Sequence, residues 1–214
     1  LSSPAAVKVF KTWTNFYKKY KLNPDINFYQ RFRVGTVPLG IAGYSQYLTF
    51  NAAAPEIADK WSVYELPGTE NENGGISSIC AGSGTGCAIM KSSKNKNAAW
   101  EFIKWWVSAD TQYNYSFNCE ALLGVSGRIM TANVSALSRL SWDRKSLDVI
   151  MKQWDNVREI EEVPGSYYVS RSIDQAFWAV YNGEKSAKES ITEWSRISDE
   201  EIKRKTEEYA YRNN

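Results

Sequence analysis

The segment from Ser92 to Ser116, SSKNKNAAWEFIKWWVSADTQYNYS, constrains the fold more than any other part of the chain. Its apolar residues recur at spacings of one, three and four, which places them on one face of a helix over residues 95–107. This face consists of Ala98, Ala99, Phe102, Ile103 and Trp106. Ser92 or Ser93 can cap that helix, and Ser108 is expected to cap a second helix over residues 109–118. The segment therefore predicts two consecutive helices.

The rest of the chain predicts an α/β protein with helix well in excess of strand. The glycine-rich apolar run over residues 76–90 predicts one or two strands, and the runs over 37–42 and 61–66 predict one strand each. Further helices are expected near residues 4–20, 26–33, 45–50, 144–158, 168–182 and 187–212. The first of these has Pro4 at the favoured first position, with Ser2 or Ser3 as its cap. The mixed pattern of residues 120–139 predicts no single element.

The composition excludes several classes of function. The 214 residues carry a net charge of +2 without a basic block, so nothing indicates a nucleic-acid partner. No apolar run reaches the roughly 18 residues that a membrane span needs. The chain contains no His, which excludes Ser-His-Asp and Cys-His catalytic sets and removes the commonest metal ligand. Its cysteines, Cys80, Cys87 and Cys119, have no zinc-site spacing; a Cys80–Cys87 disulfide and free buried thiols both stay open. No cofactor is expected.

The order of the segments resembles one protein family. A strand, a polar loop with Lys-Asn, and a helix that carries Ala-Trp-Glu-Phe-Ile-Lys-Trp resemble the extracellular solute-binding proteins of ABC importers. The resemblance is to their large sugar-binding, maltose-binding-protein-like type. Other segments agree with this family and occur in the right order: RFRVGTVPLGIAGYSQY over 31–47, WSVYELPG over 61–68, and two helices with an Asn-Gly turn over 166–192.

The resemblance implies a periplasmic-binding-protein-like (class II) α/β fold, of which this chain would be the C-terminal fragment. Residues 1–75 and 145–214 would belong to the C-terminal lobe, and residues 76–144 to part of the N-terminal lobe and the crossover segments. Ligand would bind in the cleft between the lobes, which close on it by a hinge motion. Apolar surface is expected to be exposed near residues 76–90 and 95–106, where the first lobe would pack.

The resemblance also implies a function, a location and partners. The protein would be the substrate-binding component of an ABC transporter that captures a carbohydrate, with an oligosaccharide favoured, and delivers it to the permease subunits in the membrane. It would be extracellular, either a cell-surface lipoprotein or periplasmic. Its contact with the membrane would be through a lipid anchor outside this fragment.

The first candidate binding residues are Tyr44, Gln46 and Tyr47. Tyr44 follows Gly43 at the end of an expected strand, where α/β folds place their ligands. Sugar rings stack their C–H faces on aromatic side chains, and by resemblance this neighbourhood carries a stacking aromatic. Gln46 can supply a side-chain amide to the ligand, although a solvated helix start explains it equally well.

A second candidate segment contains Ser83 and Gly84, within the run from Gly82 to Gly86. Three glycines in five residues allow a close approach of the backbone to a ligand. A phosphate-binding loop would also need a Lys and a following helix start, which this run lacks. A plain connection between strands is the alternative.

The third set consists of Tyr168, Arg171 and Arg128. Tyr168 and Arg171 are three residues apart at the start of an expected helix and share a face. Arg171 can donate to hydroxyls or a carboxylate of the ligand, or form a salt bridge with Asp174. Arg128 follows Gly127, and the two arginines together point toward an acidic sugar.

Two other classes of function stay open. A glycoside-acting enzyme would use paired carboxylates such as Glu120 and Glu162, but no further catalytic motif accompanies them. A protein-interaction domain would use the charged tail over residues 197–214, which a solvated helix face explains more simply. A binding protein without catalytic activity is the favoured interpretation.

Overall fold

A computed structural model describes residues 1–71, 73–82 and 84–213. By its internal contacts the chain divides into two compact units. Unit 1 comprises Leu1–Ile26 and Glu161–Asn214, and unit 2 comprises Asn27–Ile160. The assignment of residues 1–75 and 145–214 to one lobe, and of residues 76–144 to the other, stays a prediction.

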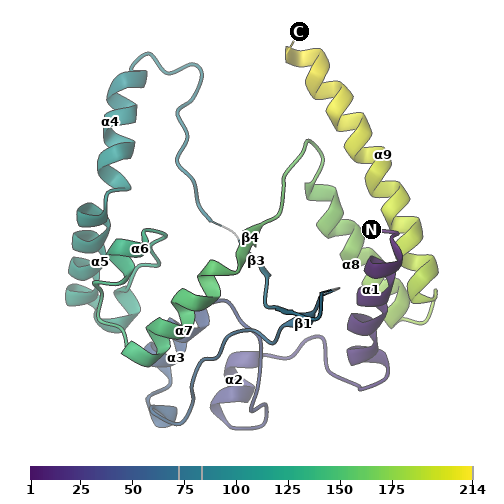
Figure 1. The fold of residues 1–214 in the computed structure, drawn as a ribbon, viewed down its shortest axis with the longest axis horizontal. Helices are drawn as coiled ribbons and strands as arrows, with labels where there is room; N and C mark the ends of the chain where they lie inside the picture. Colours follow the sequence, from purple (N-terminus) through teal and green to yellow (C-terminus); the bar gives the residue numbers. More distant parts are fainter. Residues whose placement is uncertain (72, 83, 214) are drawn as a thin grey trace. The chain divides into compact units, whose positions relative to one another are not determined.

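Unit 1 is built from α1 (Pro4–Lys18), α8 (Tyr167–Tyr181) and α9 (Ala187–Asn213), which pack on one another (Figure 1). The Ser3 hydroxyl caps α1 by accepting a hydrogen bond from the Ala6 amide at 3.2 Å, as expected. The buried core consists of Phe10, Ala176, Phe177, Val180 and Ile191. The Ser190 hydroxyl donates to the Ala176 carbonyl at 3.0 Å, which ties α9 to α8. The sequence pattern predicted all three helices, and the structure confirms them.

Unit 2 contains most of the shorter elements. Its helices are α2 (Phe28–Arg33), α3 (Ser45–Ala53), η1 (Pro55–Ile57), α4 (Lys96–Trp106), α5 (Ala109–Leu123), η2 (Gly124–Gly127), α6 (Val134–Leu137) and α7 (Arg144–Asp155). Phe50 of α3 lies at the centre of an aromatic group, with its ring 4.8 Å from Phe32 and 5.3 Å from Trp61. Leu137, Leu147 and Ile150 are buried as well.

The strands of unit 2 are short and form two separate pairs. β1 (Thr69–Glu70) and β2 (Ile76–Ser77) pair antiparallel. β3 (Cys80–Gly82) and β4 (Val157–Glu159) pair parallel, with Cys80 opposite Val157. A Cβ on Gly82 would clash with the Val157 side chain, so the close approach of these two strands requires glycine there.

The expected strands over residues 37–42 and 61–66 are wrong, because both segments are irregular in the structure. Leu39 and Ile41, expected to be buried, are largely exposed. An apolar run becomes a strand only when another strand pairs with it and a core covers it. In the described part of the chain no strand pairs with either segment, although Trp61 packs against Phe50.

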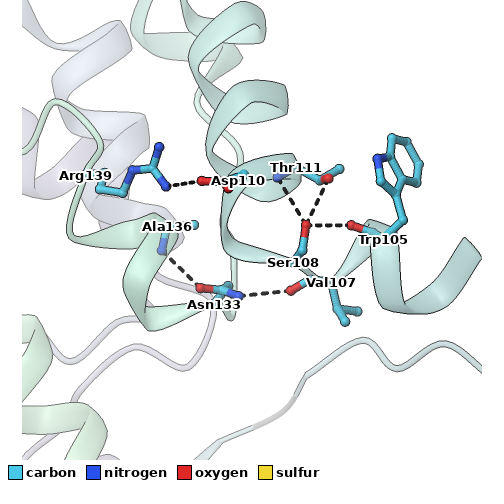
Figure 2. Close-up of polar contacts among 8 residues, drawn as sticks. All are labelled: Trp105, Val107, Ser108, Asp110, Thr111, Asn133, Ala136 and Arg139. Atoms are coloured by element: carbon cyan, nitrogen blue, oxygen red, sulfur yellow. Dashed lines mark hydrogen bonds and ion pairs between the residues drawn. The ribbon is translucent and has the colours of Figure 1, made fainter. Parts of the chain in front are cut away.

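The junction of α4 and α5 confirms one expected cap and corrects another (Figure 2). The Ser108 hydroxyl accepts a hydrogen bond from the Thr111 amide at 3.4 Å and donates to the Trp105 carbonyl at 2.8 Å. Ser92 and Ser93 do not cap α4, whose N-cap is Asn95; the Ser93 hydroxyl instead accepts from the Asn95 amide at 3.3 Å. The helix therefore begins later than the serines predicted.

Apolar side chains are exposed in the two segments where this was expected. They are Ile76, Ile79 and Met90 in the first, and Trp100, Phe102 and Trp105 in the second. α4 has no buried residue although its sequence is strongly apolar on one face. Among the described residues, no helix combines the length and the apolar character that a bilayer crossing requires.

Candidate functional site

The candidate binding residues fall in both units. Unit 2 contains Tyr44, Gln46, Tyr47, Gly84 and Arg128, and unit 1 contains Tyr168 and Arg171. Ser83 lies outside the described residues. The combination of the two groups in one site stays a prediction.

Trp142 brings three of the unit 2 residues, Tyr44, Tyr47 and Arg128, into one cluster. The Tyr47 ring stacks on Trp142 with centroids 5.0 Å apart and an angle of 27° between the rings. The Tyr44 ring lies 6.0 Å from Trp142 and 6.2 Å from Trp154 of α7. Tyr44 is the N-cap residue of α3, so both tyrosines project from the first turn of one helix. We call Tyr44, Tyr47, Arg128, Trp142 and Trp154 the Trp142 cluster.

Arg128 contacts the Trp142 ring and forms a mostly buried ion pair with Glu120. Its guanidinium carbon is 5.4 Å from the centre of the Trp142 ring, a cation–π contact. The guanidinium also donates two hydrogen bonds to the Glu120 carboxylate, at 3.0 and 2.5 Å. The side chains of Arg128 and Glu120 are only 7% and 18% exposed. Arg128 is therefore engaged inside the protein, and Glu120 has both carboxylate oxygens bonded to it.

Two polar atoms of the cluster, and one of Gln46 on the same turn of α3, are buried without a hydrogen-bond partner among the described residues. They are the Tyr44 hydroxyl, Gln46 Nε2 and Trp142 Nε1. Burial raises the pKa of Tyr44 to about 12, so its hydroxyl keeps its proton and can donate. A buried polar group without a partner costs about 1–3 kcal/mol, and native proteins contain only a few of them. Such a concentration is typical of a site that completes its hydrogen bonds with a bound molecule or water.

In unit 1, Tyr168 and Arg171 share a face of α8, as expected. The Arg171 guanidinium carbon lies 5.8 Å from the centre of the Tyr168 ring, and Arg171 is exposed. The neighbouring Tyr167 points to α9, where its hydroxyl donates to Glu201 at 2.9 Å. Gly165 precedes the helix with φ +94°, and a Cβ there would lie 3.0 Å from the Ile202 backbone. This close packing on α9 fixes where α8 begins.

Gly84 is exposed, and a Cβ added to it would meet nothing within 4 Å. The described part of the protein therefore makes no close approach at Gly84, and the role of Gly84 in binding stays a prediction.

Cys80, Cys87 and Cys119 are free thiols. The described residues also contain no group of three or more His, Cys, Asp or Glu side chains that could hold a metal ion.

Sequence reasoning missed Trp142 and Trp154, the two rings that complete the cluster. Trp142 stands just before Asp143, whose carboxylate caps α7 by accepting from the Ser146 amide at 2.8 Å. It therefore lies just before the start of a helix, and in the structure Tyr44 too lies at a helix start, as the N-cap of α3. The N-cap Asp143 was the signal that could have identified Trp142. Trp154 lies within α7, and no local pattern distinguishes it from a core residue.

Comparisons with known proteins agree with these observations. A family model for bacterial extracellular solute-binding proteins matches residues 2–113. Among solved structures, the chain is similar to an ABC transporter solute-binding protein from Thermotoga lettingae TMO bound with alpha-D-tagatose, with 22% identity and a TM-score of 0.67. The likeness covers 94% of this chain and 50% of that one, so this chain spans half the length of the solved relative. It confirms a helix-rich fold of the periplasmic-binding-protein type. No curated protein matches the chain.

Proposed function

Because the chain belongs to the family of bacterial extracellular solute-binding proteins, we propose that it is part of a protein that captures a carbohydrate for an ABC importer. The Trp142 cluster is the observation that carries this proposal. Aromatic rings and unpaired hydrogen-bond donors occur together there, and both are needed to hold a molecule with C–H faces and many hydroxyls.

The rings of the cluster supply the apolar part of such a site. Tyr44 and Trp142 are partly exposed, whereas Tyr47 is buried beside them and packs against Trp61 and Trp142. We therefore assign ligand stacking to Tyr44 and Trp142, and assign Tyr47 to the support of Trp142. Tyr168 would supply a further stacking ring from unit 1.

Polar contacts would come from the three unpaired groups, Tyr44 hydroxyl, Gln46 Nε2 and Trp142 Nε1. All three can donate a hydrogen bond and carry no charge, which fits the hydroxyl oxygens of a sugar. Arg171 is exposed and would donate to hydroxyls or a carboxylate from unit 1. Gly84 and Ser83 would contribute backbone groups.

Arg128 is better understood as a supporting residue than as a ligand contact. Its charge is compensated by Glu120, so the argument for an acidic sugar loses one of its two arginines. We propose a neutral carbohydrate as the ligand. The solved relative was bound with tagatose, a neutral sugar, which is consistent with this choice.

The remaining features of the proposal follow from the family. The protein would act outside the cell or in the periplasm, held there as a lipoprotein or free, and would deliver its ligand to permease subunits. We propose that it is not an enzyme. Glu120 is bonded to Arg128 through both oxygens, whereas a pair of catalytic carboxylates needs free oxygens directed at the substrate.

Calorimetry with a panel of neutral and acidic sugars tests the proposal on the natural gene product that contains this chain. Replacing Tyr44 with Ala should weaken binding by about 5- to 150-fold, because losing a stacking ring costs about 1–3 kcal/mol. Tyr211→Ala is the matched control, since Tyr211 is 87% exposed on α9. Unchanged affinity in Tyr44→Ala and Trp142→Ala would show that the site lies elsewhere, and consumption of the sugar would favour an enzyme.

A further inference from the structure

The C-terminal end of α1 combines positive charge with exposed apolar side chains. The first 24 residues of the chain contain no acidic residue and five lysines: Lys8, Lys11, Lys18, Lys19 and Lys21. Three of these lysines fall within the run FYKKYKL over residues 16–22, among aromatic and aliphatic residues. Basic and aromatic residues combined in this way on an amphipathic helix are typical of a segment that lies at a membrane surface.

Three apolar side chains at this end of α1 are exposed to solvent. Phe16, Tyr20 and Leu22 are 45%, 62% and 53% exposed. The Phe16 and Tyr20 rings contact each other, with their centroids 6.2 Å apart. Phe10 and Thr14 are the buried residues of the helix. Unit 1 therefore uses one face of α1 for its core and leaves these three side chains outside it.

The turn after α1 gathers the exposed side chains into one patch. Lys21 has a left-handed backbone conformation with φ 60°, which reverses the direction of the chain. The Tyr20 amide donates to the Asn15 carbonyl, and the Leu22 amide donates to the Phe16 carbonyl, both at 3.0 Å. Leu22 is thereby held beside the last turn of the helix. The patch, which we call the α1 tip, consists of Phe16, Lys19, Tyr20, Lys21 and Leu22.

The lysines of the α1 tip form no ion pair with another described residue. The lysines that do form ion pairs all lie outside α1, at Lys104, Lys152, Lys185 and Lys205. Lys19 instead lies over the Tyr20 ring, with its ammonium nitrogen 5.3 Å from the ring centre. The charges of α9 in the same unit behave differently, since Arg196 pairs with Glu200 along that helix. The positive charge of the α1 tip is therefore available to an anionic partner.

A bilayer with anionic headgroups matches both properties of the α1 tip. Its phosphates attract the lysine ammonium groups, and each lysine near such a surface strengthens binding by roughly fivefold. Aromatic and aliphatic side chains enter the boundary between headgroups and acyl chains, while the long lysine stems keep their charges among the phosphates. A polyanion in solution would use the charge alone and would gain nothing from Leu22.

We propose that the α1 tip is a site of reversible contact with a membrane surface that carries anionic phospholipid headgroups. Lys19 and Lys21 bind headgroup phosphates, and Phe16, Tyr20 and Leu22 enter the boundary with the acyl chains. This contact is separate from the capture of a carbohydrate and does not require bound sugar. It holds the protein close to the membrane in which the proposed importer lies.

Co-sedimentation with phospholipid vesicles tests this in the absence of sugar, so its outcome is independent of the proposed ligand. The natural gene product, prepared without covalently attached lipid, is mixed with vesicles of phosphatidylcholine or of equal parts phosphatidylcholine and phosphatidylglycerol. It should bind the anionic vesicles more tightly than the neutral ones, and added salt should weaken that binding.

The first pair of variants tests the lysines. Lys19→Gln combined with Lys21→Gln should weaken binding to the anionic vesicles by at least about tenfold. The matched control combines Lys188→Gln with Lys203→Gln, which removes the same charge from exposed positions of α9 in the same unit. The control should bind within about twofold of the unsubstituted protein, because charges distant from the contact are screened by salt.

The second pair of variants tests whether the apolar boundary of the bilayer is used. Leu22→Ser should weaken vesicle binding by about fivefold to tenfold, because it removes apolar area that enters that boundary. Leu122→Ser is the matched control, since Leu122 is 83% exposed on α5. All these substitutions replace exposed side chains, so circular dichroism should show the same helix content in every variant.

Three results would overturn the proposal. Equal binding to neutral and anionic vesicles, or binding to neither, would show that the lysines do not direct the α1 tip to a bilayer. A loss in the α9 control as large as in the lysine variant of the tip would show an effect of net charge alone. Equally tight binding to soluble polyphosphate, unaffected by Leu22→Ser, would identify a polyanion in solution as the partner. Losses confined to the two variants of the α1 tip support the membrane contact.

Discussion

Arg128 follows Gly127, and that position alone suggested a guanidinium free to meet an acidic ligand. The structure shows why it is not free. Gly127 is buried against α5, where a Cβ would clash with the Cys119 carbonyl oxygen, and this close approach brings Arg128 beside Glu120. Glu120 precedes Arg128 by eight residues and lies on α5, whereas Arg128 lies beyond the end of that helix, so no periodic pattern in the sequence indicates that the two side chains pair. The sequence therefore showed that residue 128 is an arginine able to donate hydrogen bonds, and only its neighbours in the fold showed that it donates them to Glu120 rather than to a ligand.

We expect Glu120→Gln to destabilise the protein by about 3 kcal/mol, because it leaves the mostly buried Arg128 charge without compensation. The change is measured as the free energy of unfolding in urea. Glu101→Gln is the matched control: Glu101 pairs with Lys104 on an exposed helix surface, where a pair is worth about 0–1 kcal/mol. Equal effects of the two substitutions would contradict the structural role of Arg128.

Glu201 in unit 1 is expected to make stability depend on acidity. Two hydrogen bonds from Arg204, at 2.8 and 2.7 Å, and one from the Tyr167 hydroxyl lower its pKa from 4.5 to about 2. Because the pKa is lower in the folded protein, this stabilisation is present above about pH 4.5 and is lost as the pH falls toward 2.

The titration can be followed by NMR of the Glu201 side-chain carboxyl carbon. Arg204→Gln should raise the pKa more than Tyr167→Phe does, since Arg204 is the larger cause of the shift. A midpoint near 4.5 in the unsubstituted protein would rule out these hydrogen bonds in solution.

At the scale of elements, most helices were predictable and strands only in part: β2 and β3 lie in the run over residues 76–90 that predicted one or two strands, and the other strand predictions failed. A helix forms its hydrogen bonds within one segment, so a period of 3.6 in the sequence is sufficient to locate it. A strand forms them with a second segment whose position the sequence does not indicate. Residues 37–42 and 61–66 have strand-like patterns and are irregular, whereas β4 (Val157–Glu159) forms where the pattern predicted the end of a helix.

Helix caps offer a test at the same scale. Ser108→Ala should lower stability by about 1 kcal/mol, because the Thr111 amide loses its acceptor at the start of α5. Ser92→Ala should change it by less than about 0.5 kcal/mol, the usual effect of a surface substitution away from a cap. Thermal and urea unfolding of the two variants would show the difference. If both behaved alike, the cap in Figure 2 would not exist in solution.

At the scale of the whole molecule, the family and the fold type could be predicted from the order of segments along the chain. The weak motifs from Arg31 to Thr192 pointed to solute-binding proteins, and the family match over residues 2–113 confirms it. The candidate site was predictable only in part. Tyr44 was found from the glycine before it and an expected strand end, and Gln46 and Tyr47 were found because they lie close to it in the sequence.

The sequence by itself determined most of the helices, though not α6 (Val134–Leu137), as well as the family and the aromatic, uncharged chemistry of the Tyr44 region, since each depends on residues within one segment. The tertiary structure decided what depends on contact between distant segments. It placed Trp142 and Trp154 against Tyr44, directed Arg128 to Glu120, and left Trp100, Phe102 and Trp105 of α4 exposed. Those outcomes depend on which segments approach one another. Burial sets the free-energy contribution of an aromatic ring, a charge or an unpaired donor, and a side chain is buried only after those segments have come together.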